Sequence, residues 1–251
     1  MRLEANSLKI NEYWNNENAQ SMYDKNMLDL EICSIISELN KEDFVLDLGC
    51  GEGEGTVEYA KVVKDIVAID SSETRLKLLS QRNFHLKRIN VDMRSLDLVL
   101  FDKLFDVVIT QRSLINLPEH SQQIDVIKQI HKVLKNKGKY IMLEGFEEGE
   151  QSINDIRVFL GLEPIKQKWH NLFFNQNELI NEISDIFELK KELGFNTFYF
   201  LTRVINARLK HPDIPKWDDE FNVMAMNLEK SFPNLIGHNF SRLKMLVFEK
   251  R

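Results

Sequence analysis

The sequence predicts an α/β protein in which helices cover both faces of a mainly parallel sheet. Short apolar runs of strand length alternate with segments of helical periodicity between residues 43 and 145. The links between them are short, and several of the apolar runs end in an acidic residue. The 251 residues include 43% hydrophobic side chains, enough for one large domain with a sizeable core.

A helix is expected over residues 19–39, because apolar residues recur there at the spacing of one helix face. Residues 43–48 form an apolar run of strand length, which a glycine-rich turn separates from a helix expected over residues 56–64. The apolar run at residues 66–69 predicts the second strand. This order of strand, turn, helix and strand is the repeating unit of a parallel sheet.

Ser71 or Ser72 can cap the next helix, since a serine hydroxyl accepts a hydrogen bond from the first helical turn. A weaker third strand is expected over residues 86–91, and a strongly apolar fourth strand over residues 105–110. The alternation of strand and helix therefore continues through the middle of the chain.

Pro118 opens a helix that Gly138 breaks, and a fifth strand is expected over residues 139–144. After Gly145 the regular alternation ends. The later predicted elements are helices over 149–161, 176–185 and 197–209 and strands over 187–193 and 243–249. We expect one domain, composed of an N-terminal helical lid (1–40), a ligand-binding core (43–145), a covering region (146–241) with a helical insertion at about 195–241, and a closing strand (243–250).

Composition excludes several classes of protein. The net charge is −6 and the basic runs are short, which disfavours a nucleic-acid surface. Two cysteines, Cys33 and Cys50, do not form a disulfide framework, and the sequence has no zinc-ligand spacing, so we expect no metal. With neither a signal-like segment nor a membrane-length apolar run, the expectation is a cytoplasmic protein that does not enter membranes.

The turn after the first strand carries glycines at every second position, starting at Gly49, with Asp47 two residues before it. Such a turn lets the backbone approach a ligand closely. The dinucleotide motif Gly-x-Gly-x-x-Gly fails in both registers, because its last position falls on Glu54 or Thr56. An NAD-linked dehydrogenase is therefore disfavoured. Asp47 better suits a ligand that presents a cation or hydrogen-bond donors.

Two further acids end the second and third predicted strands. Asp70 is placed to accept hydrogen bonds from ribose hydroxyls, and Asp92 can accept from an adenine amino group. Met93 can pack on the adenine ring. The carboxyl ends of parallel strands share one edge of a sheet, so these residues predict a site for S-adenosylmethionine (SAM).

These residues resemble the motifs of the class I SAM-dependent methyltransferases over residues 43–145. The resemblance implies a Rossmann-like sheet of order 3-2-1-4-5-7-6 with an antiparallel last strand, SAM as cofactor and S-adenosylhomocysteine (SAH) as product. It also implies that the segment after the fourth strand lies beside the transferred methyl group. The cofactor-binding residues that we predict are Asp47, Gly49, Cys50, Gly51, Gly53, Asp70, Ser71, Asp92, Met93, Gln111 and Arg112.

The segment after the fourth strand also bears on the methyl acceptor. It reads Gln111-Arg112-Ser113-Leu114 and lacks the prolines of amino-methylating DNA enzymes, so no nucleic-acid acceptor is expected. Arg112 can bind the SAM carboxylate or an anionic acceptor, or can pair with a nearby acid such as Glu119. The segments 112–118, 169–174 and 198–205 are similar to bacterial methyltransferases of surface-polysaccharide pathways. That similarity favours the hydroxyl of a sugar, nucleotide-sugar or sugar-phosphate precursor of capsule or lipopolysaccharide.

A hydroxyl acceptor needs a group that accepts its proton. The candidates are His120, His170 and Glu144, with Arg112 as a further catalytic candidate. His170 can equally be a polar residue of an aromatic cluster with Trp169. Two alternatives stay open: methylation of another small metabolite at an amine, carboxylate or phosphate-type oxygen, and a non-catalytic SAM-binding partner subunit. The sequence does not distinguish a monomer from a homodimer.

Overall fold

The computed structural model describes residues 2–82, 84–97, 99 and 101–251. Within them, a seven-stranded sheet has the order β3-β2-β1-β4-β5-β7-β6, which confirms the predicted topology. Strands β1 to β5 pair in parallel, whereas β7 is antiparallel to both β5 and β6. The strands are β1 Phe44–Leu48, β2 Asp65–Asp70, β3 Lys87–Asn90, β4 Phe105–Gln111, β5 Leu134–Gly145, β6 Phe187–Gly194 and β7 Leu243–Lys250.

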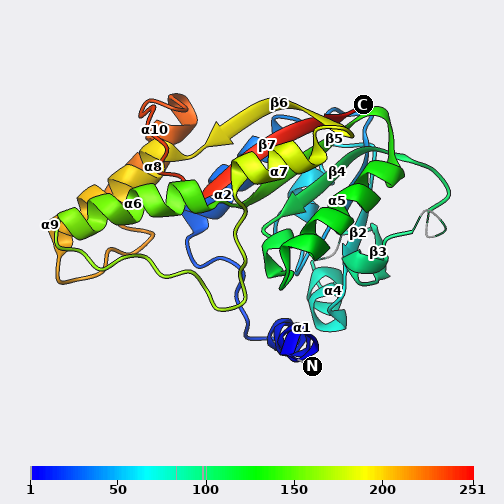
Figure 1. The fold of residues 1–251 in the computed structure, drawn as a ribbon, viewed down its shortest axis with the longest axis horizontal. Coiled ribbons are helices and arrows are strands. Elements are labelled where there is room, and N and C mark those ends of the chain that lie inside the picture. Colours follow the sequence, from blue (N-terminus) through cyan, green and yellow to red (C-terminus); the bar gives the residue numbers. More distant parts are fainter. Residues whose placement is uncertain (1, 83, 98, 100) are drawn as a thin grey trace.

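Helices cover both faces of this sheet (Figure 1). They are α1 Arg2–Trp14, α2 Lys25–Ile36, α3 Thr56–Tyr59, α4 Glu73–Ser80, α5 His120–Val133, α6 Glu147–Phe159, α7 Gln176–Ile183, α8 Asn196–Phe200, α9 Ala207–Lys210 and α10 Glu220–Ser231. A π-helical turn, η4 Leu201–Asn206, joins α8 to α9. Short 3₁₀ turns are η1 Met93–Ser95 and η3 Leu114–Asn116. None of the helices in the described part of the chain has the length and apolar character that crossing a membrane requires.

Alternate residues of the strands contribute side chains to two different hydrophobic cores, because successive side chains of a strand point to opposite faces of the sheet. Leu46 and Leu48 of β1 belong to the core that α5 and α7 cover. Val45 belongs to the opposite core, which α2, α6, α8 and α10 cover. Both faces of the strands are thus buried, as expected for the central part of a parallel sheet.

Two predicted helices are shorter in the structure. The helix expected over residues 19–39 begins only at Lys25, because Asp24 has extended backbone and its side chain accepts hydrogen bonds from the N–H groups of Asn26 (3.0 Å) and Met27 (3.1 Å). The helix expected over residues 56–64 is a single turn, α3. Both predictions were too long because apolar residues continue at helical spacing beyond the ends of the hydrogen-bonded helices.

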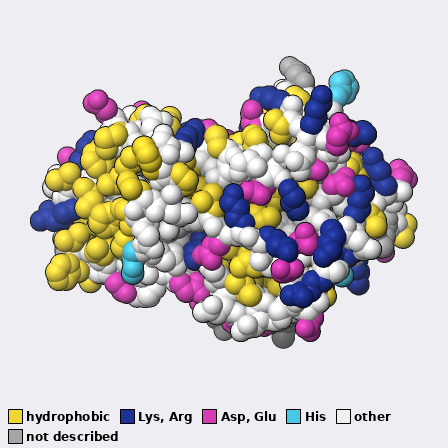
Figure 2. Space-filling view, turned by 90° about the horizontal axis from the view of Figure 1, so that it is seen from above, with side chains coloured by type: hydrophobic (Ala, Val, Ile, Leu, Met, Phe, Trp, Pro, Cys, Tyr) yellow, Lys and Arg dark blue, Asp and Glu magenta, His cyan; other side chains and the backbone are white. Residues whose placement is uncertain are grey.

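Helices α6, α8, α9 and α10 gather at one end of the molecule, away from the edge where β3 and α4 lie (Figure 1). Hydrophobic side chains are exposed over this end, whereas Lys and Arg side chains are dispersed over the other (Figure 2). The exposed apolar residues at this end are Val158, Phe159, Leu209, Ile214, Trp217, Met224, Phe232 and Leu235. We call this surface the apolar end.

Candidate active site

The glycine turn after β1 has left-handed backbone at Gly49 (φ 81°), Gly51 (φ 54°) and Gly53 (φ 76°). A Cβ atom at Gly49 would lie 2.4 Å from Cβ of Ser113, and one at Gly53 would lie 2.1 Å from Cδ1 of Leu79. At Gly51 a Cβ atom would meet no other atom within 4 Å. Gly49 and Gly53 therefore allow close packing, whereas Gly51 leaves room beside the backbone.

Asp70 at the end of β2 holds this turn in place. Its Oδ2 atom accepts the N–H of Gly51 at 2.8 Å, and its Oδ1 atom accepts the N–H of Ser72 at 2.8 Å. Burial raises the pKa of Asp70, and the two backbone donors oppose that shift. The carboxylate keeps further lone pairs for a ligand, because an ionised carboxylate accepts about four hydrogen bonds.

Asp47 lies beneath the turn and is almost fully buried. Its Oδ2 atom accepts the hydroxyl proton of Thr56 at 2.6 Å. Burial raises its pKa to about 7, although the hydrogen bond from Thr56 opposes the shift. A cationic group bound nearby would lower this pKa again, because an opposite charge favours the ionised carboxylate.

Asp92 follows β3 and caps η1 by accepting the N–H of Arg94 at 2.9 Å. The guanidinium of Arg94 also pairs with it, at 2.6 Å. Burial would raise the pKa of Asp92, but the hydrogen bonds from Arg94 hold it below its usual value. Asp92 therefore stays ionised, and Met93 lies beside it in the same cavity.

The segment after β4 is fixed by two buried carboxylates that the cofactor motif does not include. Glu144 at the end of β5 accepts the N–H groups of Ser113 (3.1 Å), Leu114 (3.0 Å) and Ile115 (3.3 Å). Burial raises the pKa of Glu144 to about 7, against these three donors. Since its two oxygens hold backbone N–H groups, Glu144 positions this segment.

The second buried carboxylate is Glu31 of α2, whose Oε2 atom accepts from Nε2 of Gln111 (2.6 Å) and Nε of Arg112 (2.9 Å). Arg112 also donates to the hydroxyl of Ser21 at 2.7 Å. The sequence suggested Glu119 as its acidic partner, and the structure places Glu31 there instead. Arg112 has a left-handed backbone (φ 52°), which is unusual for a residue with a Cβ atom and typical of functional sites.

These residues surround a first cavity of about 1080 Å³, including its open mouth, at the carboxyl ends of β1, β2 and β4. Every predicted cofactor residue lines it except Gly53, which packs against Leu79. The acidic residues of its wall are Asp47, Glu52, Glu54, Asp70 and Asp92. The open space at Gly51 and this acidic wall fit a cofactor that has an ammonium group, a sulfonium and ribose hydroxyls. They do not fit a pyrophosphate, which needs cationic or N–H donors.

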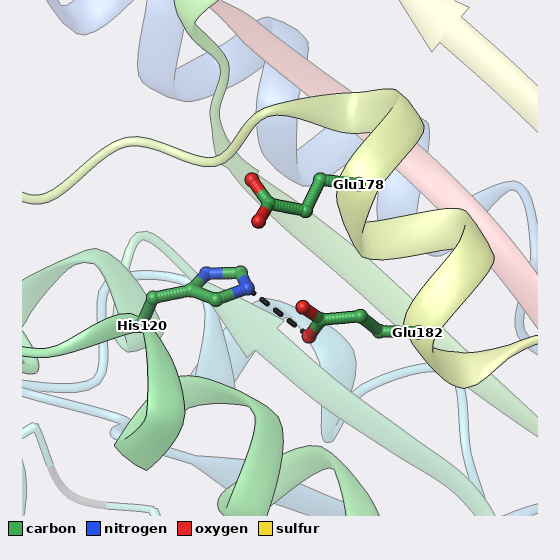
Figure 3. Close-up of side chains that lie close together, drawn as sticks. All are labelled: His120, Glu178 and Glu182. Carbon is green, nitrogen blue, oxygen red and sulfur yellow. Dashed lines mark hydrogen bonds and ion pairs between the residues drawn. The ribbon is translucent and has the colours of Figure 1, made fainter.

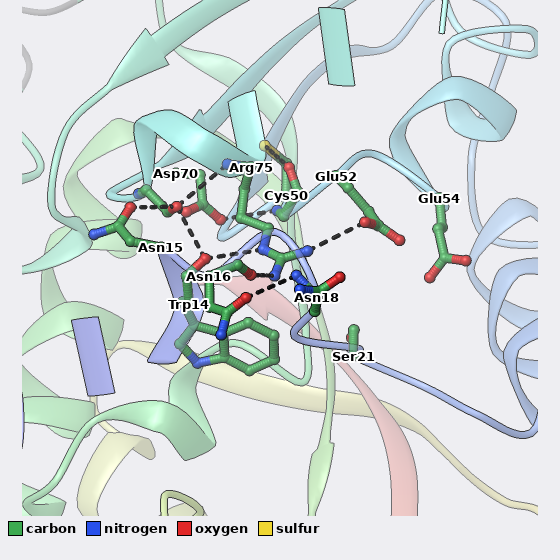
Figure 4. Close-up of polar contacts among 12 residues, drawn as sticks. Trp14, Asn15, Asn16, Asn18, Ser21, Cys50, Glu52, Glu54, Asp70 and Arg75 are labelled. Carbon is green, nitrogen blue, oxygen red and sulfur yellow. Dashed lines mark hydrogen bonds and ion pairs between the residues drawn. The ribbon is translucent and has the colours of Figure 1, made fainter. Parts of the chain in front are cut away.

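The N-terminal segment closes one side of the first cavity (Figure 4). Arg75 of α4 is buried and donates to the backbone carbonyls of Trp14 (3.0 Å) and Asn16 (2.6 Å). It also pairs with Glu52 at 3.2 Å. The hydroxyl of Ser72 donates to the side chain of Asn15 at 2.7 Å. Arg75 was not predicted from the sequence, because a basic residue in a helix usually faces solvent.

A second cavity of about 990 Å³, including its open mouth, adjoins the first, and Trp14, Ser21, Arg112 and Asn116 line both. We call these four residues the shared wall. The second cavity also contacts the segment before α7, the start of β7 and the α8–η4 helix. It is the space next to the predicted cofactor site in which an acceptor would lie.

His170 lines the second cavity and is nearly buried. Its Nδ1 atom lies 2.9 Å from Oδ1 of Asn116, whose amide nitrogen donates to the carbonyl of Arg112, so Nδ1 carries the proton. The lone pair of Nε2 is buried and has no hydrogen-bond partner among the described residues. Burial, and then the charge of Lys168, lower the pKa of His170 to about 4.

Aromatic rings enclose the imidazole of His170. Tyr13 stacks on it at 4.8 Å between ring centroids, and Trp14 and Trp169 meet it edge-on at 5.5 and 5.4 Å. The aromatic cluster with Trp169 that the sequence suggested is therefore present. Tyr13 and Trp14 come from α1, so the N-terminal segment covers His170 as well as the first cavity.

His120 lies elsewhere. It begins α5, its Nε2 atom lies 3.1 Å from Glu182 of α7, and it lines neither cavity (Figure 3). Glu178 stands beside the pair, and the ligand atoms of the three side chains lie within 4.8 Å of one another. Both glutamates are exposed, so this group resembles an ordinary surface ion pair.

Comparison with known proteins agrees with the fold and with a methyltransferase domain. Residues 45–138 match the model of a family described as "Methyltransferase domain". A demethylmenaquinone methyltransferase of Lactobacillus johnsonii is 33% identical over 171 residues, which are 64% of this chain and 62% of the relative. An uncharacterized methyltransferase of Schizosaccharomyces pombe is 25% identical over 78% of this chain and 74% of its own. An uncharacterized protein of Methanocaldococcus jannaschii is 33% identical over 126 residues, which are 48% of this chain and 50% of the relative. This chain therefore spans only half the length of that relative.

Solved structures show the same architecture. The N-methyltransferase NodS from Bradyrhizobium japonicum, in complex with SAH, superposes with a TM-score of 0.57 at 11% identity, over 98% of both chains. A putative methyltransferase in a complex with the Haloferax volcanii Trm112 methyltransferase activator gives 0.58 at 17% identity, over 90% of this chain and 92% of the other. The sheet order and the cavity at the carboxyl ends of its strands define a cofactor-binding protein of the doubly wound α/β class. Within that class, the fold is that of the class I SAM-dependent methyltransferases, and residues 45–138 match a methyltransferase domain.

Proposed function

We propose that this protein transfers the methyl group of SAM to a small acceptor bound in the second cavity. The observation that carries the proposal is the shared wall: one cavity suits the cofactor, and the adjoining cavity opens on the same four residues. The residues that would hold SAM are Asp47, Gly49, Gly51, Asp70, Asp92, Met93, Gln111 and Arg112.

Bound SAM supplies an electrophilic methyl group, so that transfer forms a bond from an acceptor atom to the methyl carbon as the carbon–sulfur bond breaks and SAH is left. The protein's own part is to align the acceptor and to exclude water. For a hydroxyl acceptor it must also remove a proton. Asp24, the only carboxylate among the residues that line the second cavity, already accepts N–H groups of α2 and pairs with Arg203.

The unpartnered Nε2 atom of His170 is therefore our candidate for the proton acceptor. Because the ring of Tyr13 stacks on the imidazole, this role requires that the Tyr13 side chain turn aside when the acceptor binds, while Trp14 stays in the shared wall. Arg112 remains a candidate for orienting the cofactor or the acceptor, since it lies in the shared wall.

The acceptor that we propose is polar, and the sequence favours a sugar, nucleotide-sugar or sugar-phosphate precursor of a surface glycan. An amine, a carboxylate or a phosphate-type oxygen of another small metabolite is the alternative. Cys33 and Cys50 are both free thiols, which agrees with the proposal that the protein acts in the cytoplasm. A mass-shift assay with a panel of sugar phosphates, nucleotide sugars and amines separates these acceptors.

Calorimetry with SAH tests the cofactor site directly. We expect binding in the micromolar range, and Asp70→Ala should weaken it at least tenfold, because it removes a charged hydrogen-bond acceptor and releases Gly51. Asp65→Ala, at the opposite end of β2, is the matched control and should leave SAH affinity unchanged. No heat from SAH or SAM at millimolar concentration would disprove the proposed function.

The apolar end favours a second candidate, a SAM-binding subunit that works with a protein partner. Phe159 and Ile214 are 86 and 88% exposed there, and a large exposed apolar surface is typical of a protein interface. This candidate predicts SAH binding without turnover on any small acceptor. Light scattering of the purified protein distinguishes a self-associated form from a monomer, and Phe159→Ser with Ile214→Ser should abolish any self-association.

A further inference from the structure

The two cavities differ sharply in charge. The second cavity is lined by five cationic side chains and a single carboxylate, that of Asp24. The cationic residues are Arg112, Lys166, Lys168, Arg203 and Arg242. The first cavity has the opposite character, with more carboxylates than cationic groups in its wall. A cationic cofactor and an anionic acceptor would each lie in a complementary field.

Three of the five cations are neutralised by carboxylates. Arg203 pairs with Asp24, Arg242 pairs with Glu150 at 2.6 Å, and Arg112 pairs with Glu31 at 2.9 Å. The other two, Lys166 and Lys168, have no carboxylate partner within the described residues. Two positive charges at this cavity are therefore uncompensated.

Lys168 is held at the cavity by neutral groups. Its Nζ atom lies 3.5 Å from the carbonyl oxygen of Ser21 and 5.7 Å from the ring centroid of Tyr23. Burial, and then the charge of Arg112, lower the pKa of Lys168, so positive charges crowd this part of the site. An anion bound there would relieve the repulsion and stabilise the ammonium.

Two further polar groups of the cavity have no partner. The Nε–H of Arg242 is buried without an acceptor, while its guanidinium lies 5.4 Å from the ring centroid of Phe173. The hydroxyl of Tyr199 makes no hydrogen bond to the described part of the protein, and burial raises its pKa to about 12, so that it keeps its proton. Both groups are donors, and the buried, unpaired N–H of Arg242 is costly unless a ligand accepts from it.

We propose that the acceptor carries a phosphate monoester, bound in the second cavity by Lys166, Lys168 and Arg242. A phosphate monoester has between one and two negative charges near neutral pH, which matches the two uncompensated lysines. Its three terminal oxygens can accept from ammonium, guanidinium and phenol donors together. A carboxylate supplies one charge and two oxygens and fits the same donors less completely. The proposal rests on the proposed function, since it names the substrate class of that site.

The test is calorimetry on the protein saturated with SAH, with glycerol phosphate, glycerate and glycerol as matched probes. We expect glycerol phosphate to bind below millimolar concentration, glycerate at least tenfold more weakly, and glycerol not at all. The double variant Lys166→Gln, Lys168→Gln should bind glycerol phosphate at least tenfold more weakly. Lys128→Gln, which alters an exposed lysine paired with Asp125, is the control and should behave as the wild type. SAH affinity and the melting temperature should be the same in all three proteins.

Three results would overturn the proposal. They are no heat from glycerol phosphate at about 10 mM, equal affinity for glycerate and glycerol phosphate, or a glycerol phosphate affinity that is the same in the double lysine variant and the wild type. Each of these presumes that SAH binds. Failure of SAH to bind the wild-type protein would instead reject the proposed function itself. Retained SAH binding without phosphate binding rejects only the acceptor class.

Discussion

The Nε atom of Arg112 lies 2.9 Å from Oε2 of Glu31, and this buried ion pair connects the end of β4 to α2 beneath the wall between the two cavities. Gln111 donates to the same oxygen at 2.6 Å. The pair fixes a residue whose backbone is left-handed and which lines both cavities. Neither partner is adjacent in sequence, so packing of α2 on the sheet creates the contact.

Glu31→Gln should lower the free energy of unfolding by about 3 kcal/mol, because it leaves the buried guanidinium of Arg112 without a counter-charge. Guanidinium chloride unfolding at neutral pH measures this. Asp125→Asn removes the exposed partner of Lys128 and should cost less than about 1 kcal/mol. Equal losses in the two variants would show that the Arg112–Glu31 pair has no special structural role.

Alanine at Gly49 and at Gly51 should have different effects. Gly49→Ala brings a Cβ atom to 2.4 Å from Ser113, so we expect a loss of stability of more than about 2 kcal/mol and loss of SAH binding. Gly51→Ala meets no protein atom, so it should cost only about 1 kcal/mol for its left-handed backbone. Its methyl group enters the first cavity, and SAH affinity should fall at least tenfold. Unchanged SAH affinity in Gly51→Ala would place the cofactor away from this turn.

Arg75→Gln should loosen the N-terminal segment, because it removes the donors to the carbonyls of Trp14 and Asn16. We expect faster hydrogen exchange in residues 6–21 and an SAH dissociation rate about tenfold higher, read by stopped flow. Arg82→Gln is the control, since the side chain of Arg82 bonds to Glu52 and to no residue of the N-terminal segment within the described residues. An unchanged exchange pattern in Arg75→Gln would mean that other contacts retain the segment.

Stability should depend on pH through Glu144. Burial raises the pKa of Glu144 in the folded state to about 7, above its ordinary value of 4.5, so the folded state retains a proton that the unfolded state releases. The contribution of this bound proton to the free energy of unfolding is complete below pH 4.5. It is lost as pH rises to about 7, at roughly 1.4 kcal/mol per pH unit. Glu144→Gln should therefore gain stability relative to the wild type between pH 5 and pH 7 in urea unfolding series. A pH-independent difference would contradict the shifted pKa.

His170→Gln should reduce kcat for a hydroxyl acceptor by about 100-fold with a smaller change in KM, because general base catalysis acts on the chemical step. Since its pKa is about 4, His170 is neutral throughout the range above pH 5.5, and the wild-type rate should show no titration near 6.5. Phe173→Leu, a change in the same cavity without a proton acceptor, serves as the comparison. A His170→Gln enzyme with normal kcat would make His170 a structural member of the aromatic cluster.

Most residues that line the first cavity at the strand ends could be predicted, because their positions follow directly from local sequence. Asp47, Asp70 and Asp92 lie at or just after the ends of three strands, and the topology of a parallel sheet brings those ends together. The sheet order, which the resemblance to class I methyltransferases implied, is also correct. Asp92 and its neighbour Met93 illustrate the limit of that argument: the sequence placed them at the cavity, but it could not foresee the ion pair with Arg94.

The second cavity could not be predicted in the same way. Lys168, Arg203 and Arg242 come from a loop, a π-helical turn and the position just before the last strand, and each resembles a solvated surface charge in its own segment. Only tertiary packing brings them to one space. The role of Glu31 could likewise not be predicted from the sequence. A glutamate in an amphipathic helix is usually exposed, whereas Glu31 is fully buried.

The shared wall has a kinetic consequence. Trp14 and Ser21 belong to the N-terminal segment, so a segment that moves aside to admit the cofactor also dismantles part of the acceptor cavity. The acceptor cavity is complete only after that segment has returned over bound SAM. We therefore expect a compulsory order of addition, with SAM first and the acceptor second, and with SAH as the last product to leave. Product inhibition by SAH would then be competitive toward SAM and noncompetitive toward the acceptor.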